Sequence, residues 1–251
     1  MSQIYNTILK HKAQNIKMLA VLIDPDKCGE KHFEKLIKLL STHIPDFIFI
    51  GGSQLKTPFA PLIQQFKNKL KTPVVIFPGD VSQFTANADA LLFLSLLSGR
   101  NAEYLIGQHV QVAMQIKKSG LETIPTGYIL IDGGRNSAVQ YISNTHPIPA
   151  DRVEIAISTA LAGEMLGMKA IYLEAGSGAL QPVSTQIIEQ VKSQLTIPLF
   201  VGGGIRTDQQ LHAAYHAGAD LVVIGNILET EPEKIESFIK IRNQINKQKG
   251  R

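Results

Sequence analysis

The feature that most constrains this chain is a series of eight short apolar runs spread over nearly its whole length. Runs of three to six residues that are almost entirely apolar are typical of parallel strands, because helices cover both faces of such a sheet. Most runs end at Gly or Asp, as expected where a strand passes into a functional loop. The runs are Leu19–Ile23, Phe47–Ile50, Val74–Phe77, Ala90–Leu94, Thr126–Ile131, Ala170–Leu173, Leu199–Val201 and Leu221–Ile224.

Amphipathic helical patterns separate most of these runs. The stretch Phe33–Leu40 repeats its apolar residues at the i, i+3, i+4, i+7 spacing of one helix face. Alternating strands and helices with right-handed crossovers close into a barrel at eight strands. An open doubly wound sheet is the alternative, but no Gly-x-Gly-x-x-Gly follows the first run. Further helices are expected over 101–118, Ile155–Met168, Thr185–Leu195, Asp208–Ala217 and Glu233–Lys247.

One strand–helix unit has too few residues to contain its helix. Only twelve residues, Pro78–Asp89, separate the third run from the fourth, and they include Pro78-Gly79 and a polar stretch over 82–87. A full crossover helix hardly fits there. At 251 residues with 44% apolar content, the chain has the size of one α/β barrel. We therefore expect a single (β/α)8 TIM-barrel domain over 1–251, with its third helix short or missing.

Composition excludes several classes of protein. A single cysteine, Cys28, excludes an internal disulfide and fits a reducing compartment. No run approaches the roughly 20 apolar residues that cross a bilayer, and Met1–Tyr5 lacks a secretory apolar core, so we expect a cytoplasmic protein. The net charge of +4 is scattered without interleaved aromatics, which argues against nucleic acid. The basic tail Lys247–Arg251 is expected to be a solvated end, with transient contact to an acidic membrane surface as the alternative.

Glycines follow each of the last three strands. They lie in Ala175–Ala179, in Gly202–Gly204 and in Gly225-Asn226. Glycine lets the backbone approach a ligand closely, so that successive N–H groups can converge on phosphate oxygens near a helix N-terminus. One glycine pair would be ordinary turn chemistry. Three such loops in succession at the last strand ends predict a phosphate site, which is typical of barrels.

Polar side chains follow the first two strands. Asp24–Lys27 comes after the first run and Gly51–Ser53 after the second. A carboxylate beside a hydroxyl at neighbouring strand ends is a plausible Mg²⁺ site, because this ion takes few protein oxygens and fills its shell with water and phosphate. The structural alternatives are a helix N-cap for Asp26 and tight turns for the glycines.

Glu174 ends the sixth strand among small residues. A carboxylate there faces the barrel mouth, where it can act as a base or bind a substrate hydroxyl, or else hold a backbone amide. Tyr172 either offers its hydroxyl to the ligand or packs in the barrel. The long polar stretch 133–152 is expected to be functional or a lid. Arg135 and Arg152 are candidates for a diphosphate contact, with plain solvation as the alternative for each.

These motifs together resemble the geranylgeranylglyceryl phosphate synthase family. Their order and spacing run from the first strand to the eighth and cover nearly the whole chain, which makes the resemblance more specific than a general phosphate barrel. The missing third helix is also a trait of that family. The motifs are Leu22–Lys27, Gly51–Ser53, Phe77–Gly79, Tyr172–Gly178, Val201–Arg206 and Gly225-Asn226.

The resemblance implies a Mg²⁺-dependent prenyl transfer. In that family an ether bond joins sn-glycerol 1-phosphate to a polyprenyl diphosphate such as geranylgeranyl diphosphate, diphosphate leaves, and the product begins ether phospholipid biosynthesis. Asp24 and Ser53 would hold the Mg²⁺, and Glu174 would orient or deprotonate the attacking hydroxyl. The residues implied to bind the glycerol phosphate are Tyr172, Leu173, Glu174, Ala175, Gly176, Ser177, Gly178, Gly203, Gly204, Gly225 and Asn226.

One departure from the family pattern concerns the diphosphate. Some shorter members carry Lys two residues before the metal-binding Asp, where this chain has Leu22, which leaves Lys27 as the candidate cation. We expect the prenyl tail to follow the open edge near Phe77–Phe84, and we expect the barrel to form a homo-oligomer. The alternatives are another prenyl length such as heptaprenyl, a phosphosugar isomerase, and a phosphate-ligand sensor without catalytic activity.

Overall fold

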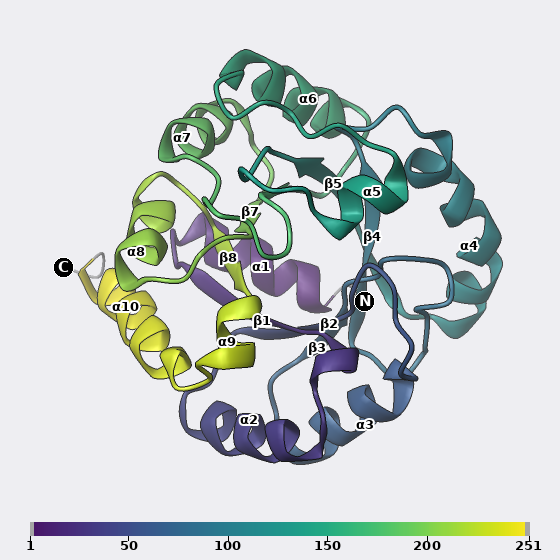
Figure 1. The fold of residues 1–251 in the computed structure, drawn as a ribbon, viewed down its shortest axis with the longest axis vertical. Coiled ribbons are helices and arrows are strands. Elements are labelled where there is room, and N and C mark those ends of the chain that lie inside the picture. Colours follow the sequence, from purple (N-terminus) through teal and green to yellow (C-terminus); the bar gives the residue numbers. More distant parts are fainter. Residues whose placement is uncertain (1–2, 249–251) are drawn as a thin grey trace.

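A computed structural model of the chain describes residues 3–248 and contains a closed barrel of eight parallel strands. The strands pair in sequence order, and β1 closes the barrel against β8. Figure 1 shows the strands at the centre of a ring of helices. The expected (β/α)8 barrel is confirmed. Its strands are β1 (Met18–Ile23), β2 (Phe47–Ile50), β3 (Val74–Ile76), β4 (Ala90–Leu96), β5 (Glu122–Leu130), β6 (Ala170–Glu174), β7 (Leu199–Gly202) and β8 (Leu221–Ile224).

The helices agree with the sequence patterns where those patterns were uninterrupted. All six expected helices are present, although the 101–118 stretch is divided into a π-helical turn and a regular helix. The elements are α1 (Gln3–Ala13), the 3-10 turn η1 (Pro25–Lys27), α2 (Glu30–Thr42), α3 (Phe59–Lys69), the π-helical turn η2 (Glu103–Gly107), α4 (Gln108–Ser119), α5 (Ala138–Ser143), α6 (Val153–Met165), α7 (Thr185–Gln194), α8 (Asp208–His216), α9 (Asn226–Thr230) and α10 (Lys234–Gln248).

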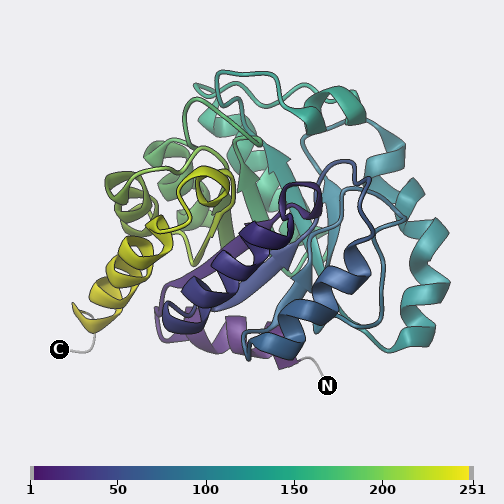
Figure 2. The same ribbon diagram turned by 60° about the horizontal axis from the view of Figure 1, so that its bottom comes forward.

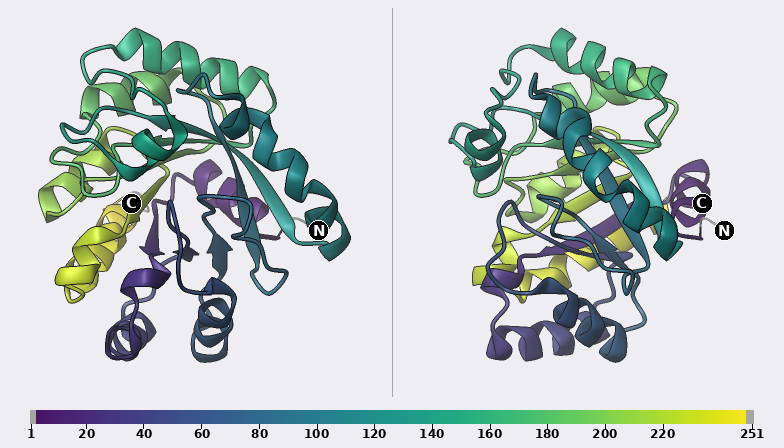
Figure 3. Two further views of the ribbon diagram at one scale, coloured as in Figure 1. Left: turned by 45° about the vertical axis from the view of Figure 1, so that its right-hand side comes forward. Right: turned by 90° about the vertical axis from the view of Figure 1, so that its right-hand side faces the viewer.

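No helix lies between β3 and β4. Residues Phe77–Asp89 form turns and extended backbone, which confirms the expected loss of the third helix. Figure 3 shows this segment as a loop between α3 and α4. The barrel wall is therefore left without a helix at this point of the ring.

The helix α1 closes the end of the barrel at which the strands begin, opposite the loops that follow the strands. Its Ile4 and Ile8 are buried in the core inside the barrel. Glu122, at the start of β5, accepts the N–H groups of Ile4 and Tyr5 at 2.9 and 2.8 Å. This carboxylate satisfies two donors of the helix N-terminus. Figure 2 shows α1 at the base of the molecule and both termini on that side.

Inside the barrel an aromatic cluster lies directly beneath the mouth. The ring of Tyr172 lies 5.4 Å from the rings of both Phe77 and Tyr128, and Phe77 stacks on Phe49 at 6.2 Å. Offset and tilted ring contacts of this kind stabilise a core beyond the area they bury. The cluster gives the functional loops above it a rigid floor.

Two expectations from the sequence concern residues outside the described part of the chain. The single domain over 1–251 and the solvated basic tail stay predictions, because residues 1, 2 and 249–251 lie outside the described part of the chain. Within residues 3–248, none of the helices has the length and apolarity needed to cross a bilayer.

Candidate active site

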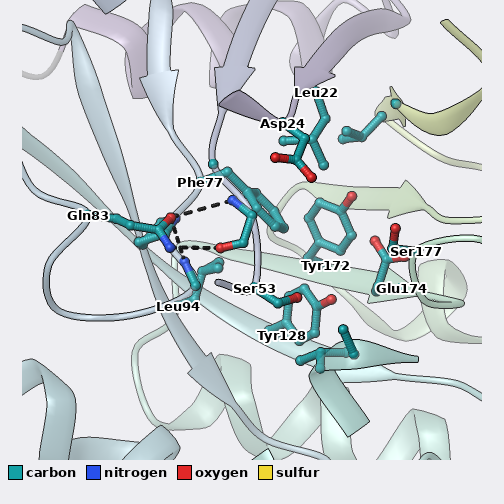
Figure 4. A pocket seen from close by; sticks show the side chains of 18 of the residues that line it. Leu22, Asp24, Ser53, Phe77, Gln83, Leu94, Tyr128, Tyr172, Glu174 and Ser177 are labelled. Carbon is teal, nitrogen blue, oxygen red and sulfur yellow. Dashed lines mark hydrogen bonds between the residues drawn. The ribbon is translucent and has the colours of Figure 1, made fainter. Parts of the chain in front are cut away.

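A cavity of about 430 Å³ begins where the strands end and continues outward beneath α4. Its mouth is polar, and Figure 4 shows the side chains of Asp24, Tyr172 and Glu174 around one space. Its outer arm is lined by apolar side chains from β4, α4 and the loop that replaces the third helix. Those side chains are Val81, Phe84, Leu91, Phe93, Val112 and Ile116.

The loops after β6, β7 and β8 converge on one side of the mouth. Asn226 Oδ1 accepts the Ser177 hydroxyl at 3.2 Å and the Gly178 N–H at 3.3 Å, which ties the β8 loop to the β6 loop. Arg206, after β7, donates from Nη2 to the Gly178 carbonyl at 3.4 Å. The three glycine-bearing loops therefore form one concave surface.

Gly203 shows why this surface needs glycine. Its φ of +79° lies in the left-handed region, and a Cβ there would collide with the Glu174 carboxylate. The same Cβ would lie 2.9 Å from the Gly176 nitrogen, so the β7 backbone packs directly on the β6 backbone. Any larger residue would separate the loops that form the surface.

Glu174 lies at the centre of the mouth. It is the last residue of β6, pairs with Leu130 of β5 and Gly202 of β7, and is only 6% exposed. Its Oε1 accepts the Gly176 N–H at 2.7 Å. Burial raises the pKa of this carboxyl to about 7, and the Gly176 N–H partly offsets the rise. The group can therefore exchange a proton near neutral pH, as a general base requires.

The raised pKa of Glu174 predicts a pH-dependent cost of folding. The pKa is higher in the folded state (about 7) than the ordinary value of 4.5, so raising the pH through this range favours the unfolded chain. Relative to wild type, Glu174→Gln is expected to gain stability above pH 7, by up to about 3 kcal/mol. Denaturant unfolding of both proteins without ligand at pH 5 and pH 8 measures this difference. An equal difference at both pH values would contradict the assigned pKa.

Tyr172 adds a hydroxyl beside Glu174. Its ring is buried in the inner core, and its hydroxyl has no hydrogen-bond partner among the described residues. Burial and then the Glu174 carboxylate raise the pKa of Tyr172 well above its ordinary value, so the hydroxyl keeps its proton. A buried O–H without a partner, in the wall of a cavity, is available to a ligand.

Asp24 and Ser53, which follow β1 and β2, also line the cavity, and the β1 loop lies next to the loop after β8 because β1 pairs with β8. Asp24 caps the η1 turn by accepting the Asp26 N–H at 3.0 Å. Lys27 lies 3.8 Å from the other Asp24 oxygen and 3.0 Å from the Glu229 carboxylate on α9. Acidic and basic side chains therefore alternate along this part of the mouth, from Asp24 through Lys27 to Glu229.

Asp26 has a separate structural role. It is absent from the cavity lining, and its carboxylate accepts the Lys56 and Thr57 N–H groups at 3.0 and 2.7 Å. These bonds hold the pKa of Asp26 below its ordinary value. The N-cap that was the structural alternative for Asp26 is not formed: Asp26 joins the loops after β1 and β2, and Asp24 caps the turn.

Gln83 connects the loop after β2 to the segment that replaces the third helix. It is 2% exposed, donates from Nε2 to the Gly52 carbonyl at 2.7 Å, and accepts the Gly79 N–H at 3.0 Å through Oε1. A Cβ on Gly79 would collide with the Gly52 carbonyl, so the two loops are in direct contact. The amide fixes the backbone one residue before Ser53.

Removing this amide is expected to loosen the Ser53 side of the cavity. Gln83→Leu leaves the partly buried Gly52 carbonyl and Gly79 N–H without the Gln83 amide, which costs at most about 1–3 kcal/mol each. We expect a lower melting temperature and, for the Mg²⁺ site that the sequence predicts at Ser53, a raised Mg²⁺ concentration for half-maximal activity. Gln83→Glu keeps the acceptor and serves as the partial control. Unchanged Mg²⁺ dependence in Gln83→Leu would limit the residue to a purely structural role.

Most of the other expected site residues also lie at the cavity. Those that line it are Tyr172, Glu174, Ser177, Gly178, Gly203, Gly204, Gly225 and Asn226, together with Asp24 and Ser53. Leu173 and Ala175 are instead buried in the core between the strands and the surrounding helices. Gly176 contributes to the site through its backbone N–H, which donates to Glu174. These three residues do not line the cavity with their side chains.

The long stretch after β5 approaches the cavity through a different segment from its arginines. Arg135 and Arg152 are both absent from the cavity lining, and Arg152 pairs with Asp151 at 3.8 Å. The short helix α5 supplies Ala138, Val139 and Ile142 to the lining instead. The part of this stretch that reaches the cavity is therefore α5, and the functional role of the stretch stays a prediction.

Arg206 and Glu229 are cavity residues that the sequence analysis did not assign to the site. Arg206 is the last residue of the Val201–Arg206 motif, so its position was a usable signal. Glu229 lies one helical turn after Gly225-Asn226 on a helix too short to produce a periodic pattern. Its approach to Lys27 depends on barrel closure between β1 and β8.

Comparison with known proteins decides the family. A model described as the PcrB family matches residues 9–242. The chain belongs to the PcrB family. Members similar to it include the geranylgeranylglyceryl phosphate synthases of Chitinophaga pinensis, 50% identical over 94% of both chains, and of Thermococcus kodakarensis, 38% identical over 95% of this chain and 93% of the relative. The family resemblance expected from the motifs is thereby confirmed.

A solved structure of a geranylgeranylglyceryl phosphate synthase has the same fold as this chain. The (S)-3-O-geranylgeranylglyceryl phosphate synthase of Thermoplasma acidophilum, in complex with its substrate sn-glycerol-1-phosphate, superposes with a TM-score of 0.89 at 33% identity, covering 98% of this chain and 99% of the other. An archaeal fructose 1,6-bisphosphate aldolase superposes with a TM-score of 0.61 at 11% identity, which reflects the shared barrel alone.

Proposed function

We propose that this PcrB-family protein joins sn-glycerol 1-phosphate to geranylgeranyl diphosphate through an ether bond and releases diphosphate. Relatives named for this activity cover nearly the whole chain. The single observation that carries the proposal is the continuity of the cavity, which joins an anion-binding surface and a near-neutral base to an apolar arm. A polar phosphate and a long hydrocarbon chain can thus be bound side by side.

The glycine loops are proposed to hold the phosphate of glycerol phosphate. Backbone N–H groups near Ser177, Gly203 and Asn226 approach without side chains between them, and Arg206 adds positive charge at the same surface. A phosphate fixed there restricts the glycerol to few orientations, which favours reaction with a neighbouring group. Glu174 and the unpaired Tyr172 hydroxyl then meet the glycerol hydroxyls.

Glu174 is proposed to accept the proton of the attacking hydroxyl. As the glycerol oxygen bonds to the first prenyl carbon, the bond from that carbon to the diphosphate oxygen breaks, and the proton passes to the Glu174 carboxylate. The near-neutral pKa of this buried group suits both uptake and release of a proton. Lys27 and Arg206 are the Lys and Arg side chains in the cavity lining that can balance diphosphate charge.

Asp24 and Ser53 are proposed to hold Mg²⁺, which would stabilise the leaving diphosphate when bound. The donors fit, because both are oxygen ligands in the cavity wall. Among the described residues, no group of three or more His, Cys, Asp or Glu side chains could hold a metal ion. Diphosphate and water would therefore complete the shell, as is usual for Mg²⁺, and Asp24 would exchange its contact with Lys27 for the ion.

The prenyl chain is proposed to occupy the arm beneath α4. Phe84 and Val81 come from the loop that replaces the third helix, so the route expected near Phe77–Phe84 leads into this arm. His109 also lines it, and burial lowers the pKa of this imidazole, which keeps it neutral beside Phe93. Such walls favour a hydrocarbon chain over a charged one.

Turnover of purified protein with Mg²⁺, sn-glycerol 1-phosphate and geranylgeranyl diphosphate tests the proposal. The expected product is an organic-extractable phosphate ester whose mass equals the sum of the substrates less diphosphate. A larger yield from heptaprenyl diphosphate would change the assigned chain length. Glycerol phosphate binding without product from any prenyl length would favour a sensor, and Mg²⁺-independent phosphosugar isomerisation would favour the isomerase.

The protein is also proposed to act as a homo-oligomer. Large apolar side chains remain exposed on the described chain, including Val110 and Met165, whose exposure is expected when a surface has a partner. The cytoplasmic location expected from composition stays a prediction, as does contact of the basic tail with a membrane surface.

A further inference from the structure

Glu229 is an acidic side chain in a cavity that is proposed to bind two anions. It lies on α9, lines the cavity and has 28% of its side chain exposed. A carboxylate close to a phosphate or a diphosphate repels the ligand unless other groups offset its charge. The proposed reaction has no step for Glu229. Its contacts therefore have to account for its place in the cavity wall.

The first contact of Glu229 is with Lys27, in the turn that follows β1. The Lys27 ammonium lies 3.0 Å from each oxygen of the Glu229 carboxylate, so the acid holds it with both oxygens. Its distance to Asp24 Oδ2 is 3.8 Å, which is longer than a hydrogen bond. Lys27 thus lies between two carboxylates and is bound by the one on α9.

This position of Lys27 matters for Asp24, the proposed Mg²⁺ ligand. Asp24 Oδ1 accepts the Asp26 N–H at 3.0 Å, and Oδ2 is the oxygen nearest to the ammonium. An ammonium and a divalent cation compete for a carboxylate oxygen, since its negative charge attracts both. Without the Glu229 charge, a shift of about 1 Å would bring Lys27 into hydrogen-bond contact with Asp24 Oδ2. Lys27 would then occupy the oxygen that the ion needs.

The second contact of Glu229 is with Asn226, three residues earlier on α9. Asn226 Nδ2 donates to Glu229 Oε1 at 3.4 Å. The Oδ1 of the same amide accepts the Ser177 hydroxyl at 3.2 Å and the Gly178 N–H at 3.3 Å. A backbone N–H can only donate, so the amide oxygen has to face the loop after β6 and the amide nitrogen has to face the carboxylate. Glu229 supplies the acceptor that this orientation requires.

Glu229 therefore joins two groups that the proposed reaction uses separately. Through Lys27 it reaches Asp24, which is proposed to bind Mg²⁺. Through Asn226 it reaches Ser177, in the loop proposed to bind phosphate. The two residues before it on α9 are buried, which fixes the carboxylate relative to the barrel. The loops after β1 and β6 thus share one acidic partner.

We propose that Glu229 is a positioning residue, which holds the Lys27 ammonium away from the Asp24 oxygen that binds Mg²⁺ and keeps the Asn226 amide turned toward the loop after β6. This role rests on the proposed function, because it takes Asp24 as a metal ligand and the glycine loops as the phosphate site. Glu229 acts through these neighbours and does not touch the reacting atoms. A plain ion pair between α9 and the β1 turn is the alternative, and it would stabilise the fold without changing the binding of either ligand.

Binding of Mn²⁺, followed by water proton relaxation, tests the first half of this role without turnover. Glu229→Gln removes the charge that holds Lys27 but leaves an amide oxygen for Asn226. Its Mn²⁺ dissociation constant is expected to rise about 5-fold, as for the loss of a partly exposed ion pair. Glu233→Gln is the matched control, because Glu233 also pairs with a lysine, Lys35, but is absent from the cavity lining. It should bind Mn²⁺ as wild type does.

Lys27→Met shows whether the effect passes through Lys27. In that chain no ammonium can move to Asp24, so adding Glu229→Gln is expected to change the Mn²⁺ dissociation constant by less than about 2-fold. A direct effect of the Glu229 charge on the ion would instead be equal with and without Lys27. That result would overturn the first half of the proposal.

Isothermal titration with sn-glycerol 1-phosphate tests the second half. Glu229→Ala takes away the acceptor of Asn226 Nδ2, and the dissociation constant is expected to rise about 5-fold, as for one lost hydrogen bond. Glu229→Gln keeps an acceptor and should change the constant by less than about 2-fold. Equal constants in wild type and Glu229→Ala would overturn this half. A lower melting temperature with both ligand constants unchanged would establish the plain ion pair instead.

Asp24→Asn separates failure of this role from failure of the proposed function. It is expected to weaken Mn²⁺ binding, because it removes the charged ligand. If it does so and Glu229→Gln does not, the role of Glu229 alone is wrong. If Asp24→Asn binds Mn²⁺ as wild type does, the proposed metal site is wrong, and the first half of the proposal falls with it.

Discussion

Replacing Glu174 with Gln is expected to lower kcat by about 10²–10⁴-fold, which is the usual contribution of general acid–base catalysis. Gln has nearly the same shape, and its amide oxygen can still accept the Gly176 N–H that Glu174 accepts at 2.7 Å. What it loses is the ability to take the proton of the attacking hydroxyl. The effect should therefore fall on kcat, while KM for sn-glycerol 1-phosphate changes little.

The pH profile separates this role from a structural one. Because the carboxyl has a pKa of about 7, wild-type turnover is expected to rise with pH through the neutral range as the base form accumulates. The residual activity of Glu174→Gln should lose that rise. Tyr172→Phe, which removes the neighbouring hydroxyl but keeps the ring contacts, is the control and should retain it. A variant with the wild-type kcat, or with the same rise, would remove Glu174 from the proton transfer.

Replacing Asp24 with Asn is expected to lower kcat/KM by about 10²–10³-fold, the cost of losing one group that stabilises charge in a transition state. The Asn oxygen can keep the cap to the Asp26 N–H, so the fold of the η1 turn should survive. The contacts of Asp24 are with Asp26 and Lys27 and not with the glycine loops, so binding of sn-glycerol 1-phosphate should be almost unchanged.

Isothermal titration with sn-glycerol 1-phosphate and turnover at several Mg²⁺ concentrations check this separation. Asp132→Asn is the matched control, because Asp132 also follows a barrel strand but is absent from the cavity lining. It should behave as wild type does. Loss of glycerol phosphate binding in Asp24→Asn, or full activity without Mg²⁺, would contradict the proposed division of the mouth into a phosphate side and a metal side.

The strands could be read from the sequence because a parallel barrel buries both faces of each strand. Runs such as Phe47–Ile50 and Leu221–Ile224 match β2 and β8 to the residue. The start of β5 could not be found in this way, since Glu122 is a polar residue whose position is explained only by the N-terminus of α1. A polar residue that pairs with a distant helix gives no periodic signal.

The missed helices have local causes. In α3, Pro61 interrupts the apolar pattern of Phe59, Leu62, Ile63 and Phe66, although Pro is tolerated in a first turn. The short helices α5 and α9 have too few turns to show a period. Their placement at the mouth depends on the closed barrel, so the sequence could indicate the loops but not the helices within them.

Some residues of the candidate site could be identified from the sequence and others could not. Asp24, Glu174 and the glycine loops were identifiable because each lies at or just after the end of a strand, and strand ends meet at one face of a barrel. Gln83 was not, because its amide joins two loops whose contact exists only after the third helix has been lost from the fold. The Lys27–Glu229 pair likewise forms across the closure between β1 and β8.

A crystal structure of this protein with sn-glycerol 1-phosphate would show how the mouth of the barrel binds this substrate. We expect the phosphate against the backbone N–H groups of the glycine loops after β6, β7 and β8, with the free terminal hydroxyl within hydrogen-bond distance of Glu174. The opening toward the arm beneath α4 should stay clear. A phosphate bound at Asp24 and Ser53, or a glycerol hydroxyl directed away from Glu174, would contradict this expectation.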